Sequence, residues 1–567
     1  MNKSKIDTFK RSPIRVRNVA IEILSSHSKV SVTVGGTTVL DDSNEKTGRG
    51  IHVVVLNEVT ASVMAYRNFD TYVRGEDVFL LEFLRDISNG RIIILAIKDE
   101  GSFSLGNETR AYIKSLGSIH APNLRWRDMW SLVAAKNRNV IGEGMNASPQ
   151  LSSWGEPLFL NAQMILEETR EVCHWSGNDA DRRKNFCDKL EGYSEVCNCN
   201  KPVSISFDPE ELEEDNLQNV PVVLIASNRP YYLYRTLRRL LSTKGVRKKN
   251  VIVFIDGYFQ APLEVCQLFD VQGIQHTPIG QKNARIHQHY KASLTATFNL
   301  FPSAQFALIL EEDLLVAQDF FSYFSQTIHL LKDEDIYCIS AWNDQGYEHS
   351  CQDPSLLYRV ETMPGLGWLL SRNLYKQELE PSWPSAEQKW DWDMWMRTER
   401  IRKGRECIIP DVSRTYHFGS KGLNMNSYFQ KRYFENHALN KHTNVRLHEV
   451  NSLKKAEYEQ TMENLIQYAT VLDKPFTCSE DYIPNTTRQT YVVYFEWLTK
   501  KEWSSWKTLA KCFHLWDIDL RGVHRGAIRI FLKKNHIIFV GVPLSPYSKF
   551  KPKALKPISI QESTVKT

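Results

Sequence analysis

The chain has 567 residues, too many for a single hydrophobic core, so two or more domains are expected. Hydrophobic residues make up 42% of it and aromatic residues 11%, which indicates a folded globular protein and excludes global disorder. The 71 basic residues nearly balance the 66 acidic ones and leave a net charge of +5, so the composition argues against a nucleic-acid-binding protein.

Targeting signals are weak at the sequence level. No stretch reaches the roughly 18–20 apolar residues of a membrane-spanning helix, and the basic N-terminal region lacks the apolar core of a signal peptide. The ten cysteines nevertheless favour a protein of the secretory pathway. Four of them fall within residues 173–199 without the paired C-x-x-C spacing of most zinc sites. This cluster favours disulfides over a bound metal, although spacing does not give the pairing.

Composition changes several times along the chain. The N-terminal part alternates β-branched runs such as "KVSVTVGGTTVL" with turn residues and contains one helical segment, "EDVFLLEFLRDI". A polar, Gly-rich, aperiodic stretch follows and indicates a linker. The predicted divisions are residues 1–18 (tail), 19–136 (β-rich domain), 137–218 (linker with the cysteine cluster), 219–548 (α/β domain with a C-terminal α/β extension) and 549–567 (tail).

Strands and helices alternate from Val220 onward. "VPVVLIA", "NVIVFIDGY" and "FALIL" are apolar strand runs, and helical segments lie between them. This β-α-β order predicts a parallel, doubly wound sheet, in which ligands bind beyond the carboxyl ends of the strands. Arg229, Asp256 and the acidic trio Glu311–Asp313 all fall at such ends.

The acidic trio follows a buried strand, where carboxylates are costly unless they are paired or bind a metal. A solvated turn between strand and helix is the plain alternative. A strand-end Asp beside other carboxylates suits a hard divalent cation. No Gly-rich phosphate loop follows the first strand, so the phosphates of a bound nucleotide would be neutralised by that metal and by Arg229.

A second group of polar residues lies in "QKWDWDMWMRTER", where Asp391 and Asp393 alternate with tryptophans. Carboxylates among indole rings are typical of sugar sites, because aromatic faces stack on pyranose rings. A helix with a Trp and Met core stripe is the alternative. Residues 417–426, "HFGSKGLNMN", are predicted to form a mobile loop that closes over a site.

Five motifs, "LILEEDLLVAQDFFSYF", "YCISAWNDQGYE", "PGLGWLL", "WDWDMWMR" and "IIPDVSRTYHFG", resemble in sequence and order the inverting β-1,2-N-acetylglucosaminyltransferases of the GT-A fold. The resemblance spans about Val220 to Pro546. It is strongest to the members that act on protein O-linked mannose, which also carry a β-rich stem domain with stretches like "GRGIHVVVLN" and "WRDMW". It implies a GT-A domain preceded by a carbohydrate-binding stem.

Roles of individual residues follow from the resemblance. Asp313 matches the side chain that binds Mn²⁺, and this ion holds the diphosphate of UDP. Glu311 and Glu312 match residues that line the ribose and GlcNAc side of the donor. The matches to nucleotide contacts are Arg229, Asp256 (at the uracil) and His289.

Asp393 matches the catalytic base of this family, and Trp392 matches the aromatic residue beside the transferred sugar. His417 is not predicted as a metal ligand, because the N-glycan enzymes of the family have no histidine there. Arg49, Asp99 and Arg127 match stem residues that bind a terminal β-linked GlcNAc, whereas the residues alone suggest ordinary surface charge. Arg521 and Arg525 are predicted to contact the acceptor peptide.

The predicted activity is Mn²⁺-dependent, inverting transfer of GlcNAc from UDP-GlcNAc to the 2-hydroxyl of O-linked mannose on glycoproteins of the dystroglycan type. The alternatives are transfer to α-mannose of N-glycans, or an inactive lectin-like protein. The family is anchored in the Golgi as type II membrane proteins, and the anchor is not visible in this sequence. No nucleic-acid partner is expected, and homo-oligomerisation is left open.

Overall fold

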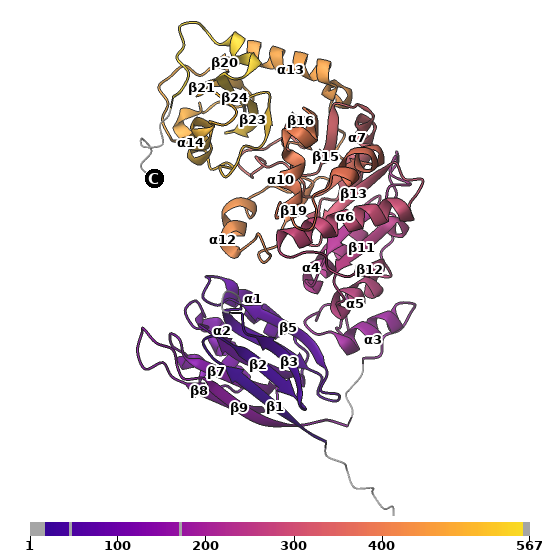
Figure 1. Cartoon of the computed structure of the whole chain (residues 1–567), viewed down its shortest axis with the longest axis vertical. Helices are drawn as coiled ribbons and strands as arrows, with labels where there is room; N and C mark the ends of the chain where they lie inside the picture. Colours follow the sequence, from indigo (N-terminus) through magenta and orange to yellow (C-terminus); the bar gives the residue numbers. More distant parts are fainter. Residues whose placement is uncertain (1–16, 45–47, 169–172, 560–567) are drawn as a thin grey trace, which may run out of the picture. The chain divides into compact units, whose positions relative to one another are not determined.

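The computed structural model describes residues 17–44, 48–168 and 173–559 (Figure 1). The predicted N-terminal tail lies largely outside the described residues, whereas residues 549–559 of the predicted C-terminal tail are described, and Ile558 pairs with Phe495 of β21. Two compact units are present, Met1–Ile205 and Ser206–Thr567. The predicted fold class, α/β preceded by a small β-rich domain, is confirmed.

The first unit contains two antiparallel sheets, ordered β3-β2-β1-β9 and β5-β4-β6-β7-β8. One hydrophobic cluster fills the space between the sheets, and a second lies between the five-stranded sheet and helices α1 and α2 (Figure 1). The middle strands are buried on both faces, which explains continuous apolar runs such as "RIIILAIK". The elements are β1 Asn18–Ser25, β2 Val30–Val34, β3 Thr37–Asp42, β4 Gly50–Leu56, β5 Val63–Phe69, α1 Glu76–Asp86, β6 Ile92–Lys98, α2 Asn107–Ser115, β7 Met129–Ala135, β8 Val140–Asn146, β9 Leu158–Ile165 and α3 Ala180–Lys189.

The prediction of a linker over residues 137–218 is wrong in its first part, because β8 and β9 lie there and complete the two sheets. Glycines hid the strand from the sequence pattern. A Cβ on Gly142 would lie 3.2 Å from the Ala162 Cβ, and one on Gly144 would lie 3.1 Å from a Leu158 methyl. These glycines let the strands β8 and β9 approach closely, at the cost of the alternation that marks a strand.

The second unit is built on an eight-stranded sheet, ordered β12-β11-β10-β13-β17-β15-β18-β16 (Figure 1). The first four strands are parallel, as predicted, but β17 and β16 run antiparallel to their neighbours, so the sheet is mixed. The elements of this part are β10 Val222–Ala226, α4 Pro230–Leu241, β11 Val251–Asp256, α5 Gln260–Phe269, β12 Gln272–His276, α6 Asn283–Leu300, β13 Phe306–Glu311, β14 Leu314–Val316, α7 Phe320–Thr327, β15 Ile336–Ser340, β16 Leu357–Val360, β17 Trp368–Ser371 and β18 Glu406–Pro410.

The remaining elements form the rim of this sheet and a C-terminal five-stranded sheet, ordered β20-β21-β24-β23-β22. They are α8 Arg372–Leu374, α9 Glu380–Ser382, α10 Trp392–Arg397, α11 Glu399–Arg402, β19 Thr415–His417, α12 Ser427–Phe429, α13 Lys455–Tyr468, β20 Thr470–Val471, β21 Thr490–Trp497, α14 Ser504–Cys512, β22 Val523–His524, β23 Ala527–Leu532 and β24 Asn535–Pro543. The C-terminal α/β extension expected from the sequence is thus a separate sheet with its own core.

Disulfides form as the cysteine cluster predicts. The four clustered cysteines pair with one another, and two further disulfides lie in the second unit. The pairs are Cys173–Cys199, Cys187–Cys197, Cys338–Cys407 and Cys478–Cys512. A chain with four disulfides is typical of an oxidising compartment.

A buried charge cluster joins the C-terminal sheet to the eight-stranded sheet. His524 Nδ1 lies 2.6 Å from Glu406 Oε1, and its Nε2 lies 3.0 Å from the Tyr547 hydroxyl and 3.5 Å from Glu459 Oε1. Arg359 donates to Glu406 at 2.7 Å. Burial lowers the pKa of His524, but the two carboxylates outweigh it and raise the pKa above its ordinary value.

We expect the stability of the second unit to depend on pH through His524. A histidine whose pKa is raised by folding stabilises fully below its unfolded pKa of about 6.5, and this contribution is lost as pH rises through the folded pKa. His524→Gln is expected to lower the free energy of unfolding by about 3–5 kcal/mol near pH 6 and by much less at pH 9. Urea unfolding at both pH values measures this difference. An equal loss at both would contradict a charged His524, and the exposed His442→Gln is the control.

Candidate active site

The acidic trio lies at the carboxyl end of β13, where Glu312 and Asp313 are only 1% and 4% exposed. Arg229, which precedes α4, neutralises both. Its Nε donates to Glu312 Oε1 at 2.7 Å and its Nη1 donates to Asp313 Oδ2 at 2.8 Å. The sequence therefore placed Arg229 and the trio correctly at one edge of the sheet, and the structure brings them into direct contact.

The carboxylates of the trio differ in their electrostatics. Burial raises the pKa of Asp313, but Arg229 and His417 outweigh it and hold that pKa well below its ordinary range. Burial and the nearby Asp313 raise the pKa of Glu311 to about 7, and the Tyr290 hydroxyl donates to Glu311. Asp313 Oδ1 is buried and accepts no hydrogen bond from the described residues. An ionised carboxylate with such an oxygen fits a hard divalent cation.

The loop at residues 417–426 lies over the trio. Arg229 Nη1 donates to the Lys421 carbonyl at 2.9 Å, and the Phe418 amide donates to the Asp313 carbonyl at 3.1 Å. Asn424 Nδ2 lies 3.5 Å from Asp391 Oδ1. These contacts connect the loop both to the trio and to the segment that contains Asp393.

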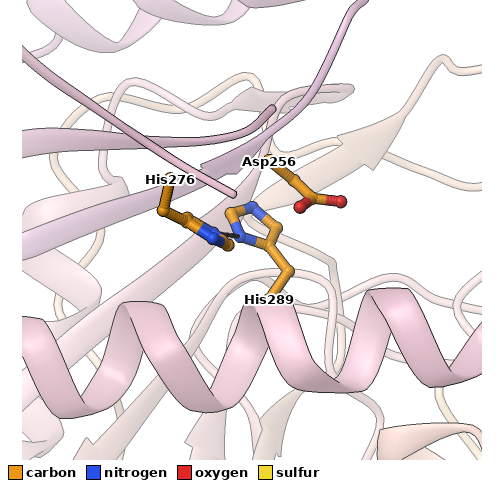
Figure 2. Close-up of side chains that lie close together, drawn as sticks. All are labelled: Asp256, His276 and His289. Carbon is orange, nitrogen blue, oxygen red and sulfur yellow. Dashed lines mark hydrogen bonds between the residues drawn. The ribbon is translucent and has the colours of Figure 1, made fainter. Parts of the chain in front are cut away.

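Asp256, His276 and His289 meet at the ends of β11, β12 and the first half of α6 (Figure 2). His276 Nε2 and His289 Nδ1 share a hydrogen bond of 2.7 Å. Burial, followed by His276, lowers the pKa of His289 to about 3, so its imidazole is neutral. Arg285 Nε donates to Asp256 Oδ2 at 2.5 Å.

These three side chains could bind either a metal ion or a nucleobase. A metal ion is a candidate because their ligand atoms lie within 4.8 Å of one another. A metal would have to displace the proton shared by the imidazoles and compete with Arg285 for Asp256. By contrast, Asp256 Oδ1 and His289 Nε2 are buried atoms without a partner among the described residues. An acceptor beside a ring nitrogen matches the N–H and carbonyl edge of a nucleobase, and this reading needs no rearrangement.

Asp393 lies on α10 and its carboxylate is about one-quarter exposed, at 27%. Arg397, one helical turn later, places Nη2 2.9 Å from Asp393 Oδ2. Trp392 is 7% exposed and stacks on Tyr290 (ring centroids 4.1 Å apart) and on Trp368 (5.7 Å). Trp392 is therefore packed in the core beneath the site and exposes little of its ring for stacking on a sugar. This matches the alternative given for this segment, a helix with a Trp and Met core stripe.

Tyr290 connects Asp393 to the acidic trio. Burial raises its pKa well above the ordinary value, and Glu311, Asp393 and Asp313 all add to this rise. The hydroxyl of Tyr290 therefore lies within electrostatic range of the three carboxylates. Tyr290 thus lies between the buried, ionised Asp313 and the partly exposed Asp393, whose carboxylate is accessible for proton transfer.

Arg521 lies in an alternating row of charges that ends at Asp393. It donates to Asp344 Oδ1 at 3.0 Å and to Asp519 Oδ1 at 2.8 Å, and Asp519 lies 3.8 Å from Arg397. Its guanidinium is thus paired with two carboxylates and is connected through Asp519 to Arg397 and Asp393. Arg525 pairs with Glu459 at 2.6 Å and is not part of this row.

Several residues of the site were missed by the sequence reading: Arg285, Tyr290, Arg397, Asp519 and His276. Only two carried a usable signal. The i, i+4 spacing from Asp393 to Arg397 predicts an ion pair once the segment is helical, and Tyr290 follows His289 directly. The other three come from different parts of the fold: His276 ends β12, Arg285 lies in the first turn of α6, and Asp519 belongs to the C-terminal region.

The stem residues form a second cluster in the first unit. Arg49 makes a two-pronged ion pair with Asp70, both bonds 2.9 Å, and lies 4.0 Å over the Tyr72 ring. The hydrogen bond to Asp70, together with the charges of Asp70 and Asp99, raises the pKa of Arg49. Asp99 accepts from Trp154 Nε1 at 2.8 Å. The charge of Asp99 therefore acts on Arg49, and Asp99 also contacts Trp154.

Arg127 completes the stem cluster. Its guanidinium lies 3.8 Å over the Trp154 ring and 5.0 Å over Trp126. Trp126 also meets Phe103, which is 63% exposed, with ring centroids 5.6 Å apart. The cluster combines exposed aromatic faces with charged hydrogen-bonding groups, the combination that binds sugars.

Comparison with known families gives two matches. A family model described as "GNT-I family" matches residues 200–553, and one described as "Interleukin-like EMT inducer" matches residues 49–138. The first covers the second unit together with residues just before it. The second covers most of the first unit's five-stranded sheet.

Individual relatives divide in the same way. Alpha-1,3-mannosyl-glycoprotein 2-beta-N-acetylglucosaminyltransferase of Arabidopsis thaliana is 35% identical over 263 residues, which are 44% of this chain and 58% of that protein. Human protein FAM3D is 29% identical over 131 residues (22% of this chain, 57% of that protein), and human protein FAM3C is 38% identical over 90 residues (16% and 39%). The chain spans less than two thirds of each of these three proteins.

Solved structures show more distant likenesses. Mannosyltransferase PcManGT from Pyrobaculum calidifontis in complex with GDP-Man and Mn2+ has a TM-score of 0.24 and 11% identity, covering 36% of this chain and 61% of that chain. Mouse xyloside xylosyltransferase 1 has a TM-score of 0.22 and 15% identity, covering 33% and 83%. Among the described residues, no helix is both long and apolar enough to cross a bilayer.

Proposed function

This chain belongs to the GNT-I family and its second unit has a GT-A-type α/β fold, and on this premise we propose that it transfers GlcNAc from UDP-GlcNAc to the 2-hydroxyl of O-linked mannose on a glycoprotein. One observation carries the proposal. The Tyr290 hydroxyl donates to Glu311 of the acidic trio and the Tyr290 ring stacks on Trp392, the neighbour of Asp393, which supports a donor-phosphate site and a base close to each other. Glycosyl transfer needs these two functions side by side.

The donor nucleotide is proposed to bind along the ends of β10, β11 and β13. Asp256 Oδ1 would accept from the uracil N3–H, and His289 Nε2 would donate to a neighbouring carbonyl oxygen. Arg229 lies between the trio and the 417–426 loop and would contact the diphosphate. Glu311 and Glu312 would line the ribose and GlcNAc side.

Asp313 is proposed to hold Mn²⁺ through the buried oxygen that lacks a partner among the described residues. Bound there, the ion would neutralise charge on the diphosphate of the donor. The choice of Mn²⁺ rests on the family resemblance and on the oxygen ligand set.

Asp393 is proposed to take the proton from the mannose 2-hydroxyl as this oxygen attacks the anomeric carbon of GlcNAc and the bond from that carbon to the β-phosphate oxygen breaks, which releases UDP. One base is enough for a single displacement with inversion, since no covalent intermediate forms. Arg397 holds one carboxylate oxygen at 2.9 Å and thereby fixes the direction of the other. Asp519 and Arg521 hold Arg397 in turn, which positions the base for in-line attack.

Two alternative functions are a transferase that uses a different acceptor and a lectin-like protein that transfers no sugar. Transfer to α-mannose of N-glycans is supported by the Arabidopsis relative, whose name gives an alpha-1,3-mannosyl-glycoprotein as the acceptor. An inactive lectin-like protein would use the stem alone. Incubation with UDP-GlcNAc, Mn²⁺ and an O-mannosyl peptide separates them, because a lectin would bind GlcNAc without releasing UDP.

The stem is proposed to bind a terminal β-linked GlcNAc through Arg49, Asp99 and Arg127, so that a glycan already modified brings the catalytic unit to neighbouring sites. The four disulfides and the family resemblance support a location in the Golgi lumen.

Arg127→Ala is expected to weaken binding of a β-GlcNAc-terminated O-mannosyl peptide by roughly 10-fold or more, because the guanidinium that caps Trp154 is lost. Calorimetric titration of the full chain measures this loss. Transfer to a single isolated O-mannosyl peptide should stay unchanged. Arg85→Ala, in an exposed ion pair of the same unit, is the matched control. Undiminished binding by Arg127→Ala would contradict the stem site.

A further inference from the structure

Asn-X-Ser/Thr tripeptides occur at four places in the sequence, and none of the roles described above uses them. Those that begin at Asn107, Asn146 and Asn485 lie in the described residues, and the one at Asn2 lies outside them. Such tripeptides accept N-linked oligosaccharides in secretory proteins, the class to which a chain with four disulfides belongs. The folded chain must also leave room for a bulky oligosaccharide on the asparagine, and this requirement separates the three positions.

Asn485 lies in the loop before β21, and its side chain is exposed. The loop is held by the residues around it. Asn535 Nδ2, on β24, donates to the Thr486 carbonyl at 2.8 Å and to the Pro484 carbonyl at 3.4 Å. Asn485 and the exposed Thr487 make no side-chain hydrogen bond or ion pair with the rest of the described chain. A substituent on Asn485 Nδ2 therefore leaves the loop in place.

Asn107 is the first residue of α2 and is also exposed. Its neighbours hold this end of the helix, since the Gly106 amide donates to Asp77 Oδ2 at 3.0 Å and Thr109 Oγ1 donates to the Asp77 carbonyl at 3.1 Å. The Asn107 side chain has no hydrogen-bond partner among the residues that the structure describes. Thr109 is only 1% exposed, so this tripeptide is accessible to a modifying enzyme only before the first unit folds.

Asn146 differs from both, because its amide is part of the connection between β8 and β9. Asn146 Nδ2 donates to the Glu156 carbonyl at 3.1 Å and to the Pro157 carbonyl at 3.2 Å, which uses both amide hydrogens. The opposite orientation of the amide would bring Oδ1 against two carbonyl oxygens. An oligosaccharide replaces one of these hydrogens, and the backbone just before β9 occupies the space that the first sugar needs.

We propose that the chain carries N-linked oligosaccharides at Asn107 and Asn485 and none at Asn146. In this modification the asparagine amide nitrogen displaces a lipid diphosphate from the anomeric carbon of a lipid-linked oligosaccharide. A carbon–nitrogen bond forms, the carbon–oxygen bond to the diphosphate breaks, and the amide loses one proton. The inference goes beyond the proposed transfer reaction and depends only on passage of the chain through the secretory pathway.

The full chain, secreted from animal cells behind a cleaved signal peptide, tests this proposal. Peptide N-glycosidase converts each glycosylated asparagine to aspartate, and mass spectrometry of the peptides then gives the occupancy of each position. Asn107 and Asn485 are expected to be converted in most molecules and Asn146 in almost none. An unmodified Asn107 or Asn485, or a modified Asn146, would overturn the proposal.

Thr487→Ala and Thr487→Ser form a matched pair of variants, since both keep Asn485. Both should fold, because Thr487 is exposed and its side chain makes no hydrogen bond within the described part of the chain. The oligosaccharide at Asn485 is expected to be lost in Thr487→Ala and kept in Thr487→Ser, and its persistence in Thr487→Ala would contradict the assignment. GlcNAc transfer by the same preparations keeps the two proposals apart. A glycosylated wild type without transfer contradicts only the proposed function, and an active but unglycosylated one contradicts only this inference.

Discussion

Replacing Asp393 with asparagine is expected to reduce GlcNAc transfer by roughly 10²–10⁴-fold, the contribution of a general base. The amide keeps the size of the carboxylate and can still contact Arg397, but it takes no proton from the acceptor hydroxyl. Because the donor nucleotide is proposed to bind at the ends of β10, β11 and β13, UDP affinity should change little. Single-turnover transfer and calorimetric UDP binding measure the two quantities separately.

Asp391 provides the matched control for this experiment. It lies two residues earlier, and burial followed by the charge of Asp393 raises its pKa. Its side chain accepts from Asn424 in the loop, so Asp391→Asn should alter donor or acceptor affinity more than the chemical step. If Asp391→Asn removes transfer and Asp393→Asn does not, the base has been assigned to the wrong carboxylate. Parallel loss of UDP binding in Asp393→Asn would also count against the assignment.

Asp313→Ala is expected to have the largest effect on donor binding. It removes the only trio carboxylate with a buried oxygen that lacks a partner among the described residues. Since loss of residues that merely orient metal ligands already costs 10–100-fold, loss of the ligand itself should weaken Mn²⁺-dependent UDP binding by about 100-fold or more. Calorimetric titration of UDP with and without Mn²⁺ measures the metal-dependent part.

The metal-free titration is the internal control for Asp313→Ala. Without Asp313, Arg229 keeps its bonds to Glu312 and to the Lys421 carbonyl and has more capacity for the diphosphate. Metal-free UDP binding should therefore be unchanged or tighter. If binding falls by the same factor with and without Mn²⁺, Asp313 acts through folding or charge alone and is not a metal ligand.

The core of the catalytic unit was predictable because its strands are continuous apolar runs. "VVLIA", "VIVFID" and "FALILE" are β10, β11 and β13, parallel as the β-α-β order requires. Two kinds of element were not predictable. β8 contains Gly142 and Gly144 where it packs against β9, so the alternation of apolar and polar side chains that marks a strand is lost. β17 joins β13 antiparallel after a Gly-rich turn, and no local pattern determines that direction.

The site was predictable where ligand groups follow strands directly, as at Asp256 and Glu311–Asp313. It was not predictable where groups converge from distant segments. The pairing of Arg521 with Asp344 was not predictable, because it depends on how the C-terminal sheet packs. His417 was excluded by family comparison, although its distance to Asp313 becomes evident once β19 pairs with β14.

A competition between two acceptors tests whether the chain transfers GlcNAc to O-linked mannose. The full chain is incubated with UDP-GlcNAc, Mn²⁺ and equal amounts of an O-mannosyl peptide and a free high-mannose glycan, and products are followed by mass spectrometry with linkage analysis. We expect the peptide to gain one β-1,2-linked N-acetylhexosamine well before the glycan does. Preferential modification of the glycan, or UDP-GlcNAc binding without transfer to either acceptor, would contradict it.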